Sequence, residues 1–311
     1  MEPTDPKRGG QGDRRSFFRV LAGIASAPLW LRALRSRGIA GEELPACTDL
    51  NAVRGSYWNE GGTYFVQPSV DASLLEQGVL RARVDGRWGE FMVSNLSEEF
   101  FQYNIEQRIR MINVMMGTEP LEMYNDAHNA AVATYGANRG DSRFSLNVAF
   151  KGMGWVPKPD VIQQMADEFY ELSNASMMAK IAKIKSNYAN TDLWRRDVLG
   201  SHELYTSRDF ETHTFLNQME NPVSVICTLA DRSYEFRTIC RLLHPGDPGL
   251  SPRDYDIVRW VNYAHDFFHG SPTGELTVHR IVALYHMVET FDNSPWGMTP
   301  TAGGMQLVPK M

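Results

Sequence analysis

Residues near the end of the chain have types and spacings that could bind a metal ion or a haem. Two pairs have members four positions apart in the sequence: His265 with His269, and Glu275 with His279. A fifth candidate, His286, follows seven positions after His279. A separation of four residues places two side chains on one face of a helix. Imidazoles and carboxylates are natural ligands for Fe, Cu and Zn, and one imidazole can also hold the iron of a non-covalently bound haem.

The elements that must position these residues are predicted to be two antiparallel helices. Ser251-Pro252-Arg253-Asp254 supplies a hydroxyl N-cap, a proline in the first turn and an acid three residues after the cap, so a helix should run from there to about residue 268. Gly270 can end it, and a second helix should run from Ser271 to about Thr290. The short connection predicts a C-terminal helical hairpin, with His265 level with His279 and His269 level with Glu275.

Two further residues could take part in this chemistry. Asp266 lies next to His265 and could accept a hydrogen bond from an imidazole N–H. His213 alternates with threonines in a predicted strand over residues 209–216, so it could face a cavity as a catalytic residue. The alternative for all these histidines is a structural role. Pairs of histidines also occur on ordinary helices, and a histidine such as His269 near a helix C-terminus is stabilised by the helix dipole.

The chain as a whole predicts an α+β fold: a single domain with short antiparallel strands and a helical bundle, closing in the C-terminal helical hairpin. Asp85-Gly86 is a two-residue turn signal, which predicts a β-hairpin formed by residues 79–84 and 88–93. Further strands are expected near residues 144–150, 209–216, 223–227 and 234–238, and further helices near 97–117, 119–134 and 175–188 and from residue 159.

Several classes of chemistry lack their sequence signatures. The chain has no P-loop and no strand-linked G-x-G-x-x-G, so no nucleotide cofactor is expected. It has no G-x-S-x-G, so a metal-independent hydrolase lacks a recognisable nucleophile. None of the three cysteines, Cys47, Cys227 and Cys240, belongs to a C-x-x-C-H motif, which excludes covalent c-type haem. Cys227 and Cys240 could form a disulfide if their predicted strands are neighbours.

The first 40 residues have the features of an export signal. Arg14-Arg15 precedes two phenylalanines, and a mostly apolar run of twelve residues extends from Val20 to Leu31. This run is too short to span a bilayer but suits a signal peptide. The segment resembles a twin-arginine (Tat) signal peptide, with cleavage expected after Ala40 and a single mature domain over residues 41–311. The alternative is an amphipathic helix that stays on the protein.

The resemblance to a Tat signal has implications for function. It implies export to the periplasm by the Tat machinery, which moves folded proteins. Many Tat passengers acquire a metal or redox cofactor before export, while others travel as partners of a signal-bearing subunit. Leu44-Pro45-Ala46-Cys47 has some likeness to a lipobox, but Gly41-Glu42-Glu43 separates it from the apolar run, which argues against a lipid anchor at Cys47.

The charge and hydropathy of the mature chain exclude two kinds of partner. Residues 1–40 hold eight of the 31 Lys/Arg and three of the 37 Asp/Glu residues, so the remainder has a net charge of −11. A domain with this negative net charge is repelled by phosphate backbones and by anionic lipid, so nucleic-acid binding is not expected. No apolar run approaches the roughly 18 residues of a spanning helix, so no stable membrane insertion is expected.

Together these features predict a periplasmic, cofactor-dependent enzyme. It would be an oxidoreductase or oxygenase acting on a small-molecule substrate, with Fe, Cu, Zn or haem bound between the last two helices. The alternative is a non-catalytic binding or accessory subunit that is exported by the Tat route with a partner. The alternative predicts a large apolar patch on the surface and no stoichiometric metal.

Overall fold

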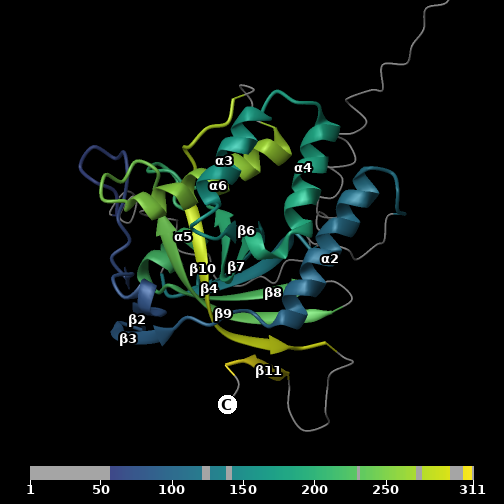
Figure 1. Ribbon diagram of the computed structural model, residues 1–311. Helices are drawn as coiled ribbons and strands as arrows, with labels where there is room; N and C mark the ends of the chain where they lie inside the picture. The colour runs from purple at the N-terminus through teal and green to yellow at the C-terminus, as the bar shows by residue number, and fades with distance from the viewer. Residues whose placement is uncertain are drawn as a thin grey trace, which may run out of the picture. The chain divides into compact units, whose positions relative to one another are not determined.

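A curved antiparallel sheet dominates the computed structural model. The structure describes residues 57–120, 127–137, 142–229, 232–270, 275–294 and 304–309, all within the unit Cys47–Met311. The main sheet has eight strands and forms a half-barrel, and a separate three-stranded sheet and five α-helices accompany it in the described part of the chain (Figure 1). The signal-like segment 1–40 and Cys47 lie outside the described residues.

The described elements follow one another in an irregular alternation of helices and strands. The helices are α2 (Glu98–Met115), α3 (Ile162–Glu171), α4 (Met177–Ala189), α5 (His213–Glu220) and α6 (Pro252–His269), with short 3-10 turns η2 (Leu75–Gln77) and η3 (Thr191–Leu193). The strands are β1 (Val70–Asp71), β2 (Val79–Val84), β3 (Arg87–Met92), β4 (Asn129–Tyr135), β5 (Leu146–Gly152), β6 (Gly154–Pro157), β7 (Trp194–His202), β8 (Val223–Leu229), β9 (Ser233–Leu243), β10 (Val282–Asp292) and β11 (Met305–Val308).

The two edges of the main sheet meet at one end. The strand order is β5-β4-β8-β9-β10-β7-β6, and β11 pairs with β10. Only Met153 separates β5, at one edge, from β6, at the other. The chain therefore passes directly between the edges and curls the sheet. We call this place, formed by Gly152, Met153 and Gly154, the closed end of the half-barrel.

Helix α6 packs across β6 and β7, close to α3 (Figure 1). Its residue Trp260 donates a hydrogen bond to the Trp155 carbonyl oxygen on β6 at 3.1 Å. The ring of Phe267 stacks on Phe169 of α3 with centroids 4.1 Å apart. Gly200 on β7 lets the helix approach closely, because a Cβ there would lie 2.9 Å from a methyl group of Val261. The middle and the end of α6 are thereby fixed against the sheet and α3.

Several elements form as their local signals predict. Asp85 and Gly86 have positive φ values of 49° and 77° in the turn between β2 and β3, as a two-residue hairpin requires. Ser251 caps α6 by accepting a hydrogen bond from the Asp254 backbone N–H at 3.1 Å. Gly270, with φ of 81°, ends that helix.

The predicted helical bundle and C-terminal helical hairpin are wrong. Residues Val282–Asp292 form β10, which lies between β9 and β7 in the centre of the sheet. Six consecutive side chains, from Val282 to Met287, are buried, so the strand is covered on both faces. A strand buried on both faces has an almost continuous apolar sequence, and such a run does not by itself distinguish a strand from a buried helix.

Two other elements also differ from the prediction. Thr212 caps a helix by accepting a hydrogen bond from the Phe215 backbone N–H at 3.2 Å, so the predicted strand 209–216 is replaced by the start of α5. The second part of the predicted helix 119–134 is instead β4, in which Ala130, Val132 and Thr134 are buried alternately. In each case the buried positions follow the spacing of the observed element.

Two further predictions concern a disulfide between Cys227 and Cys240 and the absence of a membrane-spanning helix. Strands β8 and β9 are neighbours, but Cys227 lies opposite Glu235, while the Cys240 backbone N–H donates to the Pro222 carbonyl oxygen. Cys227 and Cys240 are accordingly free thiols. None of the helices in the described ranges combines the length and apolarity needed to cross a membrane.

Candidate functional site

Four histidines from three parts of the chain meet at the closed end of the half-barrel. His128 precedes β4, whose first residue pairs with Gly152, and His202 ends β7. His265 and His269 lie on the last turns of α6. We call these four residues the histidine cluster.

The imidazole rings of the histidine cluster form a chain of close neighbours. The ring centroids of His265 and His269 are 4.8 Å apart. His202 meets His265 edge-on at 5.1 Å, and His128 lies 6.2 Å from His269. The pair His265 and His269 shares one helix face, as their spacing predicts. The residue before β4 and the last residue of β7 supply the two flanking rings.

Two buried polar residues of α6 hold the segment before β10 beside the histidine cluster. Asn262 donates to the Arg280 carbonyl oxygen and accepts from the Arg280 backbone N–H, at 3.2 and 2.9 Å. Asp266 accepts hydrogen bonds from the backbone N–H and the hydroxyl of Thr277, and it forms an ion pair with Arg280 at 2.7 Å. Asp266 also lies 3.3 Å from Nδ1 of His265, the contact that the sequence suggests. This carboxylate can therefore orient the His265 ring.

Desolvation, complete for His128 and partial for His265 and His269, keeps the imidazoles neutral near pH 7. Desolvation, assisted by the neighbouring charges of Arg108 and the other imidazoles, lowers the pKa of His128 to about 3. Desolvation and the proximity of His265 lower the pKa of His202 to about 3 and that of His269 to about 4. The pKa of His265 is also lowered, mainly by desolvation and against the opposing effect of Asp266. A neutral imidazole has the free lone pair that a metal ion needs.

One nitrogen of the histidine cluster lacks a partner. His202 Nε2 is buried and has no hydrogen-bond partner among the described residues. Buried polar atoms in proteins are nearly always paired, so this nitrogen is available to a ligand. Across the described ranges, however, no three His, Cys, Asp or Glu side chains converge tightly enough to hold a metal ion. The geometry therefore fits an open site based on two imidazoles, His265 and His269, with further nitrogens close by.

The other predicted site residues lie in different places. His279 is exposed in the segment before β10, close enough that its charge lowers the pKa of His265. Glu275 is exposed at the start of the same segment. His286 is buried on β10 and lines a pocket at the opposite end of α6. His213 opens α5, where its Nε2 lies 3.3 Å from the Ala137 carbonyl oxygen. The predicted level pairing of helical residues does not occur, because residues 282–292 form a strand in place of the second helix.

His128 and His202 were not among the residues predicted for the metal site. Both are brought to the site by strand pairing between distant segments: β4 with β5, and β7 with β6 and β10. The local signal was a histidine at the end of a strand, which is too common to single out. A buried ion pair between Lys151 and Glu203 lies beside them, and the Lys151 ammonium also reaches the His202 carbonyl oxygen at 3.5 Å.

Comparisons with known proteins add little. The chain matches no protein-family model and no curated protein. The crystal structure of Group A Streptococcus HupZ, carrying V5 and hexahistidine tags, is similar over 54% of this chain and 86% of that chain, with 13% sequence identity and a TM-score of 0.29. This similarity is too slight to indicate a shared function.

Proposed function

We propose that the protein is exported by the Tat route and binds a transition-metal ion at the histidine cluster, where it acts as an oxidoreductase or oxygenase on a small molecule. The observation that carries the proposal is the chain of four neutral imidazoles at the closed end of the half-barrel. Fe, Cu and Zn all accept imidazole nitrogen. His265 and His269 would bind the ion first, since they share a helix face.

A metal ion bound by His265 and His269 would keep coordination positions that no protein side chain fills. Only two imidazoles are aligned on the helix, and the exposed side of His269 gives access from solvent. A metal with open positions supplies Lewis acidity and can bind oxygen, water or a small organic molecule. The protein would contribute orientation: Asp266 fixes the His265 ring, and the unpartnered Nε2 of His202 belongs to a ring that could share a ligand with its neighbour His265.

The test is metal analysis of protein purified after native export. The proposal predicts about one Fe, Cu or Zn per chain, and a variant with His265→Ala and His269→Ala should lose it. His213→Gln is the matched control, because this histidine lies on α5 outside the histidine cluster. A visible-region spectrum taken on the same sample distinguishes a metal ion from haem. Metal far below one per chain, without haem absorbance, contradicts the proposal.

A second candidate function, a binding or accessory subunit, is favoured by an apolar strip along and just before β5. Phe144, Leu146, Val148 and Phe150 are exposed by 76, 61, 58 and 77%. They alternate along an edge strand, so their side chains lie on one face of the sheet. Exposed apolar strips of this kind often mark a protein interface.

The two candidate functions give different results after native export. An accessory subunit should migrate as a complex with a partner by light scattering coupled to size exclusion. A Val148→Lys and Phe150→Lys variant should then migrate as the free chain, while its metal content stays unchanged. An unchanged mass for the wild-type and variant proteins, equal to that of one chain, contradicts the accessory role.

A further inference from the structure

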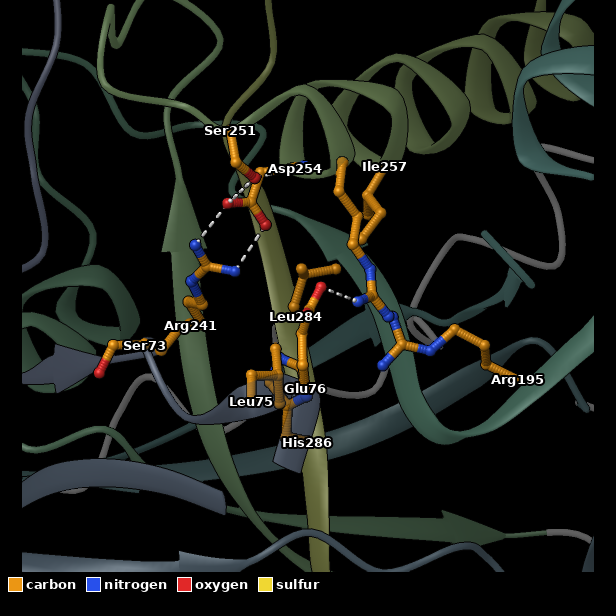
Figure 2. Close-up of a pocket in the computed structure, with 12 residues that line it drawn as sticks. Ser73, Leu75, Glu76, Arg195, Arg241, Ser251, Asp254, Ile257, Leu284 and His286 are labelled. Carbon is orange, nitrogen blue, oxygen red and sulfur yellow. Dashed lines mark hydrogen bonds and ion pairs between the residues drawn. The ribbon is translucent and has the colours of Figure 1, made fainter. Parts of the chain in front are cut away.

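A second site lies at the opposite end of α6, where the first turn of the helix meets the sheet. A pocket of about 380 Å³ opens there, a volume in the range of small-molecule sites. Strands β7, β9 and β10 contribute its floor, and η2 and the start of α6 form its walls (Figure 2). Along α6 the pocket reaches Ile257 and the histidine cluster begins at His265, so roughly 12 Å of helix separates the two sites, at about 1.5 Å per residue.

A buried histidine without partners lines the pocket. His286 on β10 is 1% exposed, and neither of its ring nitrogens has a hydrogen-bond partner in the described part of the chain. Desolvation lowers its pKa to about 3, so the ring is neutral and offers one N–H donor and one acceptor. Leaving both unpaired in a protein interior is costly, and a bound polar molecule would remove that cost.

Three arginines, Arg195, Arg241 and Arg253, line the same pocket, and two of them are held by carboxylates. Arg195 pairs with Asp197 through two contacts of 2.9 and 2.6 Å. Arg241 pairs with Asp254 at 2.6 and 2.7 Å, as the dashed lines in Figure 2 mark. Each guanidinium has five N–H donors, and a carboxylate engaged in this way uses two of them. The carboxylates therefore orient the guanidinium groups and leave them with donors for a ligand.

The third arginine has a weaker partner. Arg253, in the first turn of α6, contacts Glu76 at 3.3 Å, as the dashed line in Figure 2 marks. The Glu76 side chain is 83% exposed, and a surface ion pair of this kind contributes little to stability. An incoming anion can replace Glu76 without breaking any buried contact.

We propose that this pocket binds a small molecule through an oxyanion, a phosphate or carboxylate group, held by Arg195, Arg253 and an N–H of His286. The ligand displaces Glu76 from Arg253. The N-terminal end of α6, with its positive dipole, adds to the attraction for negative charge. This site does not depend on metal binding at the histidine cluster.

Isothermal titration of the purified protein tests the proposal, with inorganic phosphate and succinate as separate probes at constant ionic strength. At least one probe should bind saturably. Arg253→Gln and His286→Leu should each weaken binding about tenfold, the loss expected from one charge-assisted or buried hydrogen bond. Glu76→Gln should strengthen binding, because it removes the competing carboxylate. The probe that binds identifies the ligand as a phosphate or a carboxylate.

Arg259→Gln is the matched control. This arginine lies on the same helix and pairs with Asp167 on α3, outside the pocket, so its replacement should leave binding unchanged. Thermal unfolding of each variant without probe shows that it is folded. Absence of saturable binding for both probes overturns the proposal, and so does an equal loss in the Arg253 and Arg259 variants.

Discussion

The ring of His202, at the end of β7, lies edge-on to the ring of His265 on α6, with centroids 5.1 Å apart and an angle of 86° between the planes. The two residues are distant in sequence and meet because α6 packs across β7. The buried Nε2 of His202 has no hydrogen-bond partner in the described ranges, whereas Nδ1 of His265 contacts Asp266. One ring is thus oriented and the other is available to a ligand.

Close packing of α6 on β7 depends on Gly200. A Cβ at this position would lie 2.9 Å from a methyl group of Val261, so Gly200→Ala must shift the Val261 side chain, the helix or the strand. We expect it to lower the free energy of unfolding by about 1–3 kcal/mol, a typical cost of overpacking. Gly154→Ala is the control, because its Cβ would meet only the Gly200 carbonyl oxygen at 3.7 Å. Chemical denaturation should show a clearly larger loss for Gly200→Ala; equal losses would contradict this role.

Replacing one partner of the buried Lys151–Glu203 pair should be more damaging than replacing both. The two side chains are 9 and 2% exposed, so Lys151→Met leaves a buried carboxylate without its cation. The expected loss is about 3–5 kcal/mol. Adding Glu203→Leu should recover much of it. Urea denaturation of the single and double variants measures the difference, and a double variant no more stable than the single one would refute the argument.

Stability should fall as the pH drops below about 6.5, the ordinary pKa of histidine in the unfolded chain. His286 is fully buried and has a folded-state pKa of about 3, so the unfolded chain takes up a proton in this range and the folded chain does not. His286→Leu should therefore reduce the loss of stability between pH 7 and 5.5 by about 1 kcal/mol. Met287→Leu, a buried neighbour that does not titrate, should leave the pH dependence unchanged. Equal pH dependence in the His286 variant and wild type would argue against a neutral buried imidazole.

The parts of the fold with strong local signals were predictable. Asp85-Gly86 marks the hairpin between β2 and β3, and Ser251 marks the start of α6, because turns and helix caps depend on neighbouring residues. The central strand β10 was not, since its apolar run fits a buried helix equally well until its partners β7 and β9 are known. The pair His265 and His269 was therefore found on its helix, while the predicted facing pair was not.

Only two of the four residues of the histidine cluster, His265 and His269, were predicted from the sequence, because the other two depend on strand pairing. His128 and His202 reach α6 because β5 and β6 join the two edges of the sheet, and this closure depends on pairings between segments far apart in the chain. His286, in contrast, was predicted to belong to the metal site but lies outside it. Its distance in sequence from His279 suggested one helix face, but an extended strand carries it to the pocket at the start of α6.

Titration of Cu²⁺ into the purified protein tests metal binding at the histidine cluster most directly, because copper binds imidazole most tightly among the divalent first-row metals. We expect one site per chain whose affinity falls at least tenfold in His269→Ala and remains unchanged in His213→Gln. Equal affinity in the wild type and both variants would contradict it.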